Sequence, residues 1–78
     1  MRNTVSKRLL HEKIIGENIR RQRRAMKLTQ ERLAEKADLH PVYLGQVERG
    51  EESASVRALT RIAKALKVPL KDLVDGVK

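Results

Sequence analysis

The 78-residue sequence contains no cysteine and a single aromatic residue, Tyr43. Without cysteine, neither disulfide bonds nor thiolate-bound metals can stabilise the chain. The hydrophobic core must therefore be built from aliphatic side chains. A chain of this length suits one small domain with a modest core, and oligomerisation is a common way for such domains to bury more surface.

Long apolar runs are also absent. No stretch approaches the roughly 18 consecutive apolar residues that a transmembrane helix needs, so we expect no membrane span. Near the N-terminus, Leu9 and Leu10 are followed at once by the charged residues of HEK, which is not the pattern of a signal peptide. The resulting expectation is a cytoplasmic protein.

Residues suited to catalysis or metal binding are few. The only histidines are His11 and His40, and they lack the paired spacing of metal ligands. Ser53 and Ser55 have no evident His/Asp partners for nucleophilic catalysis, and no glycine-rich phosphate loop is present. We therefore expect no enzyme activity, no cofactor and no metal.

Positive charge, in contrast, is concentrated near the N-terminus. Residues 1–27 contain nine Lys/Arg and two acidic residues, whereas residues 28–78 contain nine and eight, so +7 of the net +8 charge lies in the first third. The densest part is RRQRR at 20–24. Such a field favours a polyanionic partner, either nucleic acid or anionic lipid, although a solvated helix face carries similar charge.

The spacing of apolar residues predicts helices and no strand, and hence an all-α bundle. Each expected helix has one apolar face, for example Ile15, Ile19 and Met26 in the first helix, or Leu59, Ile62, Ala63 and Leu66 in the fourth. The five expected helices cover residues 14–27, 29–37, 41–48, 55–67 and 70–76. In the last of these, the residues expected to point inward are Leu70, Leu73 and Val74.

Residues that favour helix ends support these boundaries. Thr29 and Ser55 are good N-caps. Pro41 suits the first position of a helix, where its missing N–H is not needed and its fixed φ is helical. We expect Asp38 to end the second helix and Gly50 to supply a left-handed stop after the third.

The helices at 29–37 and 41–48 are joined by a short turn, and Ala34 and Ala37 allow close approach, as in a helix-turn-helix. From Ile15 to Gly76 the chain resembles the Cro and phage-repressor family of helix-turn-helix DNA-binding domains, also called the xenobiotic-response-element type. The matching segments are LTQERLAEKADL at 28–39, YLGQVERG at 43–50 and IAKALKVPLKDL at 62–73.

This resemblance implies a five-helix lambda-repressor-like bundle in residues 13–78, preceded by a basic extension, residues 1–12, that could be helical. It also implies a sequence-specific double-stranded DNA-binding transcriptional regulator, acting as a homodimer on a palindromic operator. The family includes restriction–modification controller proteins, phage repressors and antitoxins, among which the sequence does not choose. The alternative is an antitoxin-like module that binds a partner protein, with weak DNA binding. A membrane-surface role is less favoured, because the basic helix needs its apolar stripe for the core.

Site residues follow from the resemblance position by position. Those implied to face base edges in the major groove are Pro41, Val42, Gly45 and Gln46. Gln46 is the best candidate, because its amide can pair with adenine N6 and N7; otherwise it is a solvated side chain. Those implied to contact phosphate are Lys27, Thr29, Gln30, Tyr43, Arg49 and Arg57, although Tyr43 could equally pack at the junction between helices.

Two structural roles complete these expectations. Arg23 and Glu48 match the family's partly buried ion pair. The apolar residues Leu70, Leu73, Val74 and Val77 are candidates for a dimer surface, with simple capping of the bundle as an equal alternative.

The sequence departs from the family pattern in three places. Asp38 replaces the usual glycine of the turn, and Asp tolerates left-handed φ better than most residues. His40 replaces Ser or Thr at an N-cap, so we expect a less well capped helix. Glu51 and Glu52 lie in a loop that approaches DNA in many relatives, so we expect that loop to swing away or to use only backbone N–H groups.

Overall fold

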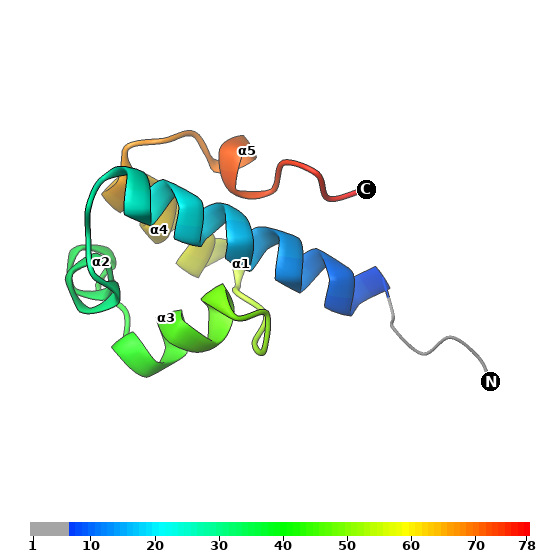
Figure 1. The fold of residues 1–78 in the computed structure, drawn as a ribbon, viewed down its shortest axis with the longest axis horizontal. Coiled ribbons are helices and arrows are strands. Elements are labelled where there is room, and N and C mark those ends of the chain that lie inside the picture. Colours follow the sequence, from blue (N-terminus) through cyan, green and yellow to red (C-terminus); the bar gives the residue numbers. More distant parts are fainter. Residues whose placement is uncertain (1–6) are drawn as a thin grey trace.

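The computed structural model describes residues 7–78, which form five helices connected by short turns (Figure 1). These are α1 (Lys7–Ala25), α2 (Gln30–Ala37), α3 (Pro41–Glu48), α4 (Val56–Leu66) and α5 (Leu70–Leu73). Within residues 7–78 there is no strand, and no helix is both long and apolar enough to cross a membrane. The predicted all-α bundle of five helices is confirmed.

The first helix differs most from its prediction. It begins at Lys7, well before residue 14, and it runs through residue 12 without a break, so the expected extension lies partly in α1 and partly outside the described residues. It also ends earlier, at Ala25, because Lys27 adopts φ 58° and turns the chain. Met26 therefore lies in the turn, 38% exposed, and its predicted place in the core is wrong.

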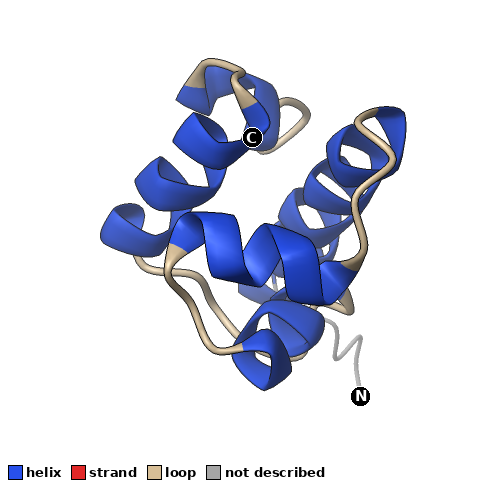
Figure 2. Ribbon diagram, turned by 90° about the vertical axis from the view of Figure 1, so that its left-hand side faces the viewer, coloured by secondary structure: helices blue, strands red, loops and turns tan. Residues whose placement is uncertain are grey.

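Every helix contributes one fully buried side chain to a single core. These are Ile19 of α1, Leu33 of α2, Leu44 of α3, Ile62 of α4 and Leu73 of α5, each 0% exposed. The helices cross one another around this core rather than lying parallel (Figure 2). The predicted apolar faces of α2 and α4 are confirmed, since all of their members are buried.

Side-chain caps define the starts of α2 and α4 as the sequence predicts. The Thr29 hydroxyl accepts a hydrogen bond from the Arg32 N–H at 3.0 Å. The Ser55 hydroxyl accepts one from the Ala58 N–H, also at 3.0 Å. Each of these bonds satisfies a backbone donor that has no partner inside its helix.

The end of α2 and both ends of α3 are also well defined. Asp38 ends α2 with φ 57°, and Gly50 follows α3 with φ 75°, both as predicted. The prediction that His40 caps α3 poorly is wrong. Its Nδ1 accepts a hydrogen bond from the Val42 N–H at 3.1 Å, so a ring nitrogen takes the place of the usual hydroxyl oxygen.

The C-terminal helix is shorter than predicted and its residues divide between core and surface. Leu73 is fully buried, so it belongs to the bundle and cannot form a dimer surface, whereas Leu70, which we expected to point inward, is 38% exposed. Asn18 of α1 holds this region in place. Its Nδ2 donates to the Leu73 carbonyl at 3.0 Å and to the Asp75 carbonyl at 2.9 Å.

Candidate nucleic-acid interface

The helix-turn-helix is formed by α2 and α3, and α3 has two distinct faces. Its inner face packs against α1 and α2, and there Leu44, Val47 and Glu48 are buried. On the other side Pro41 is exposed and Val42 is 61% exposed. In Figure 1, α3 lies at the edge of the molecule, so its outer face is open to a large partner.

A glycine on α1 allows α3 to approach closely. A Cβ atom on Gly16 would lie 2.4 Å from the Val47 carbonyl oxygen and 2.5 Å from that of Glu48. These are backbone atoms that cannot move without moving α3. The absence of a side chain at Gly16 therefore sets the separation between α1 and the C-terminal end of α3.

The Glu48 carboxylate lies at the centre of a buried polar network. Arg23 donates to it twice, from Nε to Oε2 at 2.7 Å and from Nη2 to Oε1 at 3.0 Å. The third Arg23 group, Nη1, donates to the Leu28 carbonyl at 2.8 Å. Two parallel bonds of this kind fix orientation as well as contributing energy, so α1, α3 and the turn before α2 are held in one arrangement.

Gln30 completes this network instead of standing free at the surface. Its Nε2 donates to Glu48 Oε1 at 2.9 Å, which ties the start of α2 to the end of α3. Arg20 adds a longer-range charge, with its Nε 3.9 Å from the same oxygen. One of the two Gln30 N–H groups is thus used internally, and it holds the two helices of the motif together.

The outer face of α3 and the start of α2 enclose a shallow groove. Residues that we predicted separately to face bases or phosphate line it together: Gln30, Pro41, Val42, Gly45 and Arg49, with Glu31 at its edge. Gln46 is partly buried beside the groove, one helical turn after Val42. The structure therefore brings most of the predicted α2 and α3 contacts to one surface.

Gly45 also lines this groove, and its predicted contact with a base stays a prediction. It is buried, and a Cβ atom there would lie 3.2 Å from Arg49 Nη1 and 3.4 Å from Gln30 Oε1. The side chains of Arg49 and Gln30 therefore cover it. Its lack of a side chain makes room for these two groups.

Arg49 is paired with an acidic residue in the following loop. Its Nε lies 3.0 Å from Glu51 Oε2, and its Nη2 lies 3.1 Å from Glu51 Oε1. These hydrogen bonds hold the pKa of the Glu51 carboxyl below its ordinary value and raise the pKa of Arg49. We expected this loop to swing away from DNA or to use only backbone N–H groups, and both alternatives remain predictions; in the free protein Glu51 is paired with Arg49.

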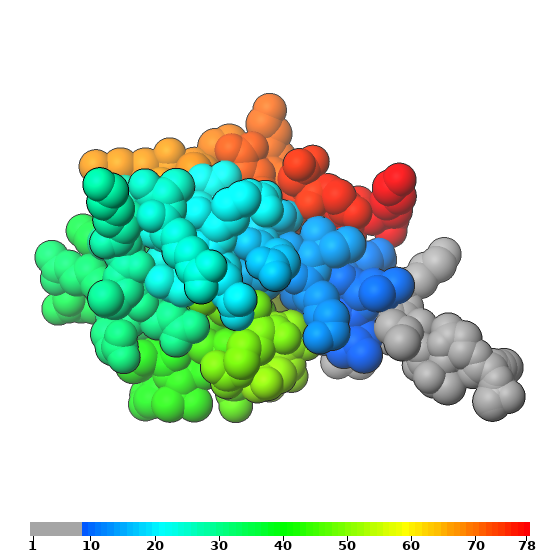
Figure 3. All heavy atoms as spheres, in the orientation of Figure 1, coloured from blue at the N-terminus to red at the C-terminus, as the bar shows by residue number. Residues whose placement is uncertain are grey.

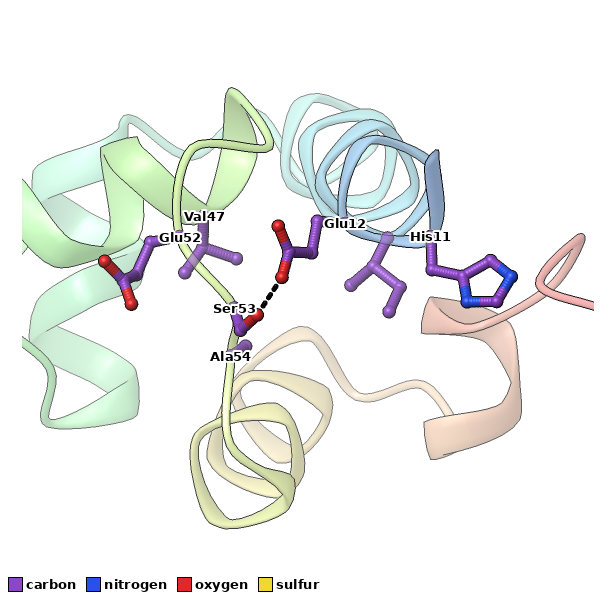
Figure 4. Close-up of a pocket in the computed structure, with 7 residues that line it drawn as sticks. His11, Glu12, Val47, Glu52, Ser53 and Ala54 are labelled. Carbon is purple, nitrogen blue, oxygen red and sulfur yellow. Dashed lines mark hydrogen bonds between the residues drawn. The ribbon is translucent and has the colours of Figure 1, made fainter. Parts of the chain in front are cut away.

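The loop from Gly50 to Ser55 is held against α1, as the space-filling view shows for the yellow-green segment beside the blue and cyan helix (Figure 3). Ser53 Oγ donates to the Glu12 carboxylate, and the two side chains point toward one another (Figure 4). Gly50 contacts Lys13 so closely that a Cβ atom would lie 3.0 Å from the Lys13 Cα. Both contacts fix the position of the loop that carries Glu51.

Tyr43 packs within the bundle, which is one of the two roles that the sequence left open for it. It is partly buried and packs against the core, while its hydroxyl donates to the Ser53 carbonyl oxygen at 3.3 Å. The ring therefore supports the same loop from the side of α3. Its predicted phosphate contact remains a prediction.

The other predicted phosphate-contacting residues lie apart from the groove. Lys27 is exposed in the turn after α1, and Arg57 is exposed in the first turn of α4. The Thr29 hydroxyl is used as an N-cap. No group of His, Asp or Glu residues suited to hold a metal occurs in the described part of the chain.

Three structural contributions, two at this site and one at the C-terminal end of the bundle, were missed from the sequence. Arg20 and Asn18 looked like ordinary polar residues of a basic helix, and no pattern marks them. Gly16, in contrast, could have been noticed, because a glycine inside a helical pattern often indicates a close approach of another backbone.

Comparison with known proteins agrees with this geometry. Residues 19–73 match the family model HTH_3, described as helix-turn-helix. The chain belongs to this helix-turn-helix family. It is a DNA-binding transcriptional regulator of the Cro and phage-repressor type, and its family is one of regulators rather than enzymes.

Small control proteins are among the regulator's relatives. It is 40% identical over 69 residues to "Control protein C.SmaI" of Serratia marcescens, covering 86% of this chain and 82% of the relative. It is 38% identical over 63 residues to "Control protein C.BamHI" of Bacillus amyloliquefaciens, covering 80% and 78%. A solved structure, the restriction-modification controller protein C.AhdI from Aeromonas hydrophila, superposes with a TM-score of 0.78 at 34% identity, covering 80% of this chain and 94% of that one.

Proposed function

We propose that this regulator binds double-stranded DNA sequence-specifically by placing the outer face of α3 in the major groove. The observation that carries the proposal is the division of α3 into two faces. Its inner face is fixed by the Glu48 network, while Val42 and the neighbouring Gln46 lie on or beside the open side. A helix held rigidly by its inner face can present side chains to base edges with a defined register.

The roles of individual residues follow from their chemistry. Gln46 can pair with adenine N6 and N7, whereas Val42 and Pro41 offer apolar contact, for example to a thymine methyl group. Phosphate contacts are proposed for the start of α2, for Arg49 and Tyr43, and for the exposed cations Lys27 and Arg57. Such contacts fix the position of the protein on the duplex without reading sequence.

We further propose that the regulator acts as a homodimer on a palindromic operator in the cytoplasm. A single module of this kind buries only about 600–1,000 Å² of protein surface on DNA, so one copy should bind weakly. Two copies related by a two-fold axis would read half-sites about one helical turn apart. With Leu73 in the core, the remaining candidates for the dimer surface are Leu70, Val74 and Val77. Among the classes in this family, the similarity to C.SmaI, C.BamHI and C.AhdI favours a restriction–modification controller.

Selection from a pool of random duplexes tests this proposal. We expect enrichment of a short palindrome, with affinity that falls steeply as salt rises. In a parallel selection, Gln46→Ala should lose preference at one position in each half-site; an unchanged motif would show that Gln46 does not read a base.

Two other results would contradict parts of the proposal. Enrichment of no sequence would favour the protein-interaction alternative. Sedimentation that shows a monomer at high micromolar concentration, both with and without the selected DNA, would exclude the homodimer.

A further inference from the structure

We infer that Glu51 competes with DNA phosphate for Arg49 and so limits the regulator's affinity for the DNA backbone. This inference rests on the proposed function, because Arg49 is one of the proposed phosphate contacts. It assigns a role to an acidic residue in a chain whose net charge is +8, at a position where DNA is expected to come close.

The competition follows from the donors that each partner needs. Glu51 occupies Arg49 Nε and Nη2 with two near-parallel hydrogen bonds. A phosphate group is recognised by the same planar fork of N–H groups as a carboxylate. Three of the five Arg49 N–H bonds remain, two on Nη1, which lies over Gly45, and one on Nη2. A phosphate can therefore use the fork formed by Nε and Nη2 only when Glu51 is displaced, and otherwise it meets a guanidinium whose charge is already paired.

Glu51 is well placed to compete because its backbone is fixed. Its N–H donates to the Gln46 carbonyl at 2.8 Å, directly after the end of α3. The residues on either side are anchored as well, Gly50 against Lys13 and Ser53 on Glu12. No backbone freedom is lost when the carboxylate meets Arg49, so only the two side chains must be ordered for the pair to re-form when phosphate leaves.

The neighbouring Glu52 provides a matched control. It carries the same charge in the same exposed loop, but it lines a different hollow, between the loop and α1, together with His11 and Ser53 (Figure 4). Any general electrostatic repulsion of DNA should be similar for both residues. Only Glu51 is bonded to Arg49.

The inference can be tested by measuring how tightly a non-specific duplex binds to the wild type and to four variants. The variants are Glu51→Gln, Glu52→Gln, Arg49→Ala and the double variant Glu51→Gln/Arg49→Ala. Fluorescence anisotropy over a salt series should show that Glu51→Gln binds about two- to fivefold more tightly than Glu52→Gln. The slope of log K against log salt should also steepen by about 0.9 in Glu51→Gln, because one more phosphate contact releases counterions. The double variant should bind like Arg49→Ala alone.

Three other outcomes would contradict the inference or the proposed function. Equal binding by Glu51→Gln and Glu52→Gln would show a charge effect only and would overturn the inference. Weaker binding by Glu51→Gln would overturn it too, by showing that Glu51 supports Arg49 in the complex. If the wild type and every variant fail to bind any duplex, the proposed function fails together with the inference, whereas either preceding result leaves the proposed function intact.

Discussion

The inner and outer faces of α3 each carry an arginine–glutamate pair, and the two pairs differ chiefly in their surroundings. On the inner face the side chains of Arg23 and Glu48 are 11% and 0% exposed, whereas on the outer face those of Arg49 and Glu51 are 49% and 56% exposed. Both pairs use two hydrogen bonds from Nε and Nη2. Because the hydrogen bonds are of the same kind, the difference in side-chain exposure determines what each pair can do.

A buried pair is costly to break, because the remaining charge stays buried without its closest opposite charge. An exposed pair contributes little to stability, since water can replace either partner. The inner pair therefore suits a permanent structural joint that fixes the orientation of α3. The outer pair suits an exchangeable contact, in which a phosphate group can take the place of the carboxylate.

Among the changes that test this comparison, Arg23→Ala should have the largest effect on stability. The fully buried Glu48 carboxylate would lose both of its Arg23 donors, and removal of one partner from a buried pair typically costs about 3–5 kcal/mol. Urea unfolding followed by circular dichroism should show this loss in the free energy of unfolding. The control Arg24→Ala changes an exposed neighbour on the same helix and should stay within about 0.5 kcal/mol. Equal effects of the two changes would refute a special role for the buried pair.

The next effect compares Gly16, which faces α3 from α1, with Gly45, which lies within α3 on the side of the groove. Gly16→Ala should destabilise the fold by about 1–3 kcal/mol, because its methyl group meets the backbone of Val47 and Glu48. Gly45→Ala meets only the mobile ends of Arg49 and Gln30, and alanine favours the helix, so stability should change little or rise by up to about 1 kcal/mol. Thermal unfolding of both variants checks this contrast. A larger loss of stability for Gly45→Ala than for Gly16→Ala would contradict the assignment of rigid backbone contacts to Gly16 and mobile side-chain contacts to Gly45.

A smaller effect concerns the start of α3. His40→Ala removes the acceptor of the Val42 N–H and should cost about 0.5–1 kcal/mol of unfolding free energy. His40→Asn, which offers a side-chain oxygen at the same position, should recover most of that loss. If His40→Ala is as stable as the wild type, the ring does not act as a cap.

The smallest effect is a titration on the outer face. The pKa of Glu51 is lowered by its hydrogen bonds from Arg49, so the contribution of this pair is complete above the ordinary carboxyl pKa and is lost as pH falls through the lowered one. Carboxyl NMR should give Glu51 a midpoint below the ordinary carboxyl range. Arg49→Ala should return Glu51 to the ordinary range; an unchanged midpoint would mean that Arg49 is not the cause.

Several parts of the fold could be predicted because their signals are local. Thr29, Pro41, Gly50 and Ser55 each act on backbone groups within a few residues, and all four lie where the sequence placed them. Met26 was misplaced because a helical period cannot show where a helix ends when a non-glycine residue adopts left-handed φ. The sequence left the helical state of residues 1–12 open, because residues 7–12 continue the helix without an apolar face of clear period.

The side-chain partners of the site were harder to predict. The Arg23–Glu48 pair came from the family resemblance, since nothing in local spacing joins residues on different helices. The bonds from Gln30 to Glu48 and from Arg49 to Glu51, like the covering of Gly45, had no sequence signal. They depend on which atoms come close after the helices have packed.

The sequence by itself determined the all-α class, four of the helix ends, the apolar faces of α2 and α4, and the location of the helix-turn-helix. These features follow from hydrogen bonding and periodicity within single segments. Only the tertiary structure decided that Leu73 belongs to the core, that Glu48 joins α1, α2 and α3, and that Glu51 holds Arg49. Burial and partner choice depend on distances between segments, and these distances arise only when the helices pack around one core.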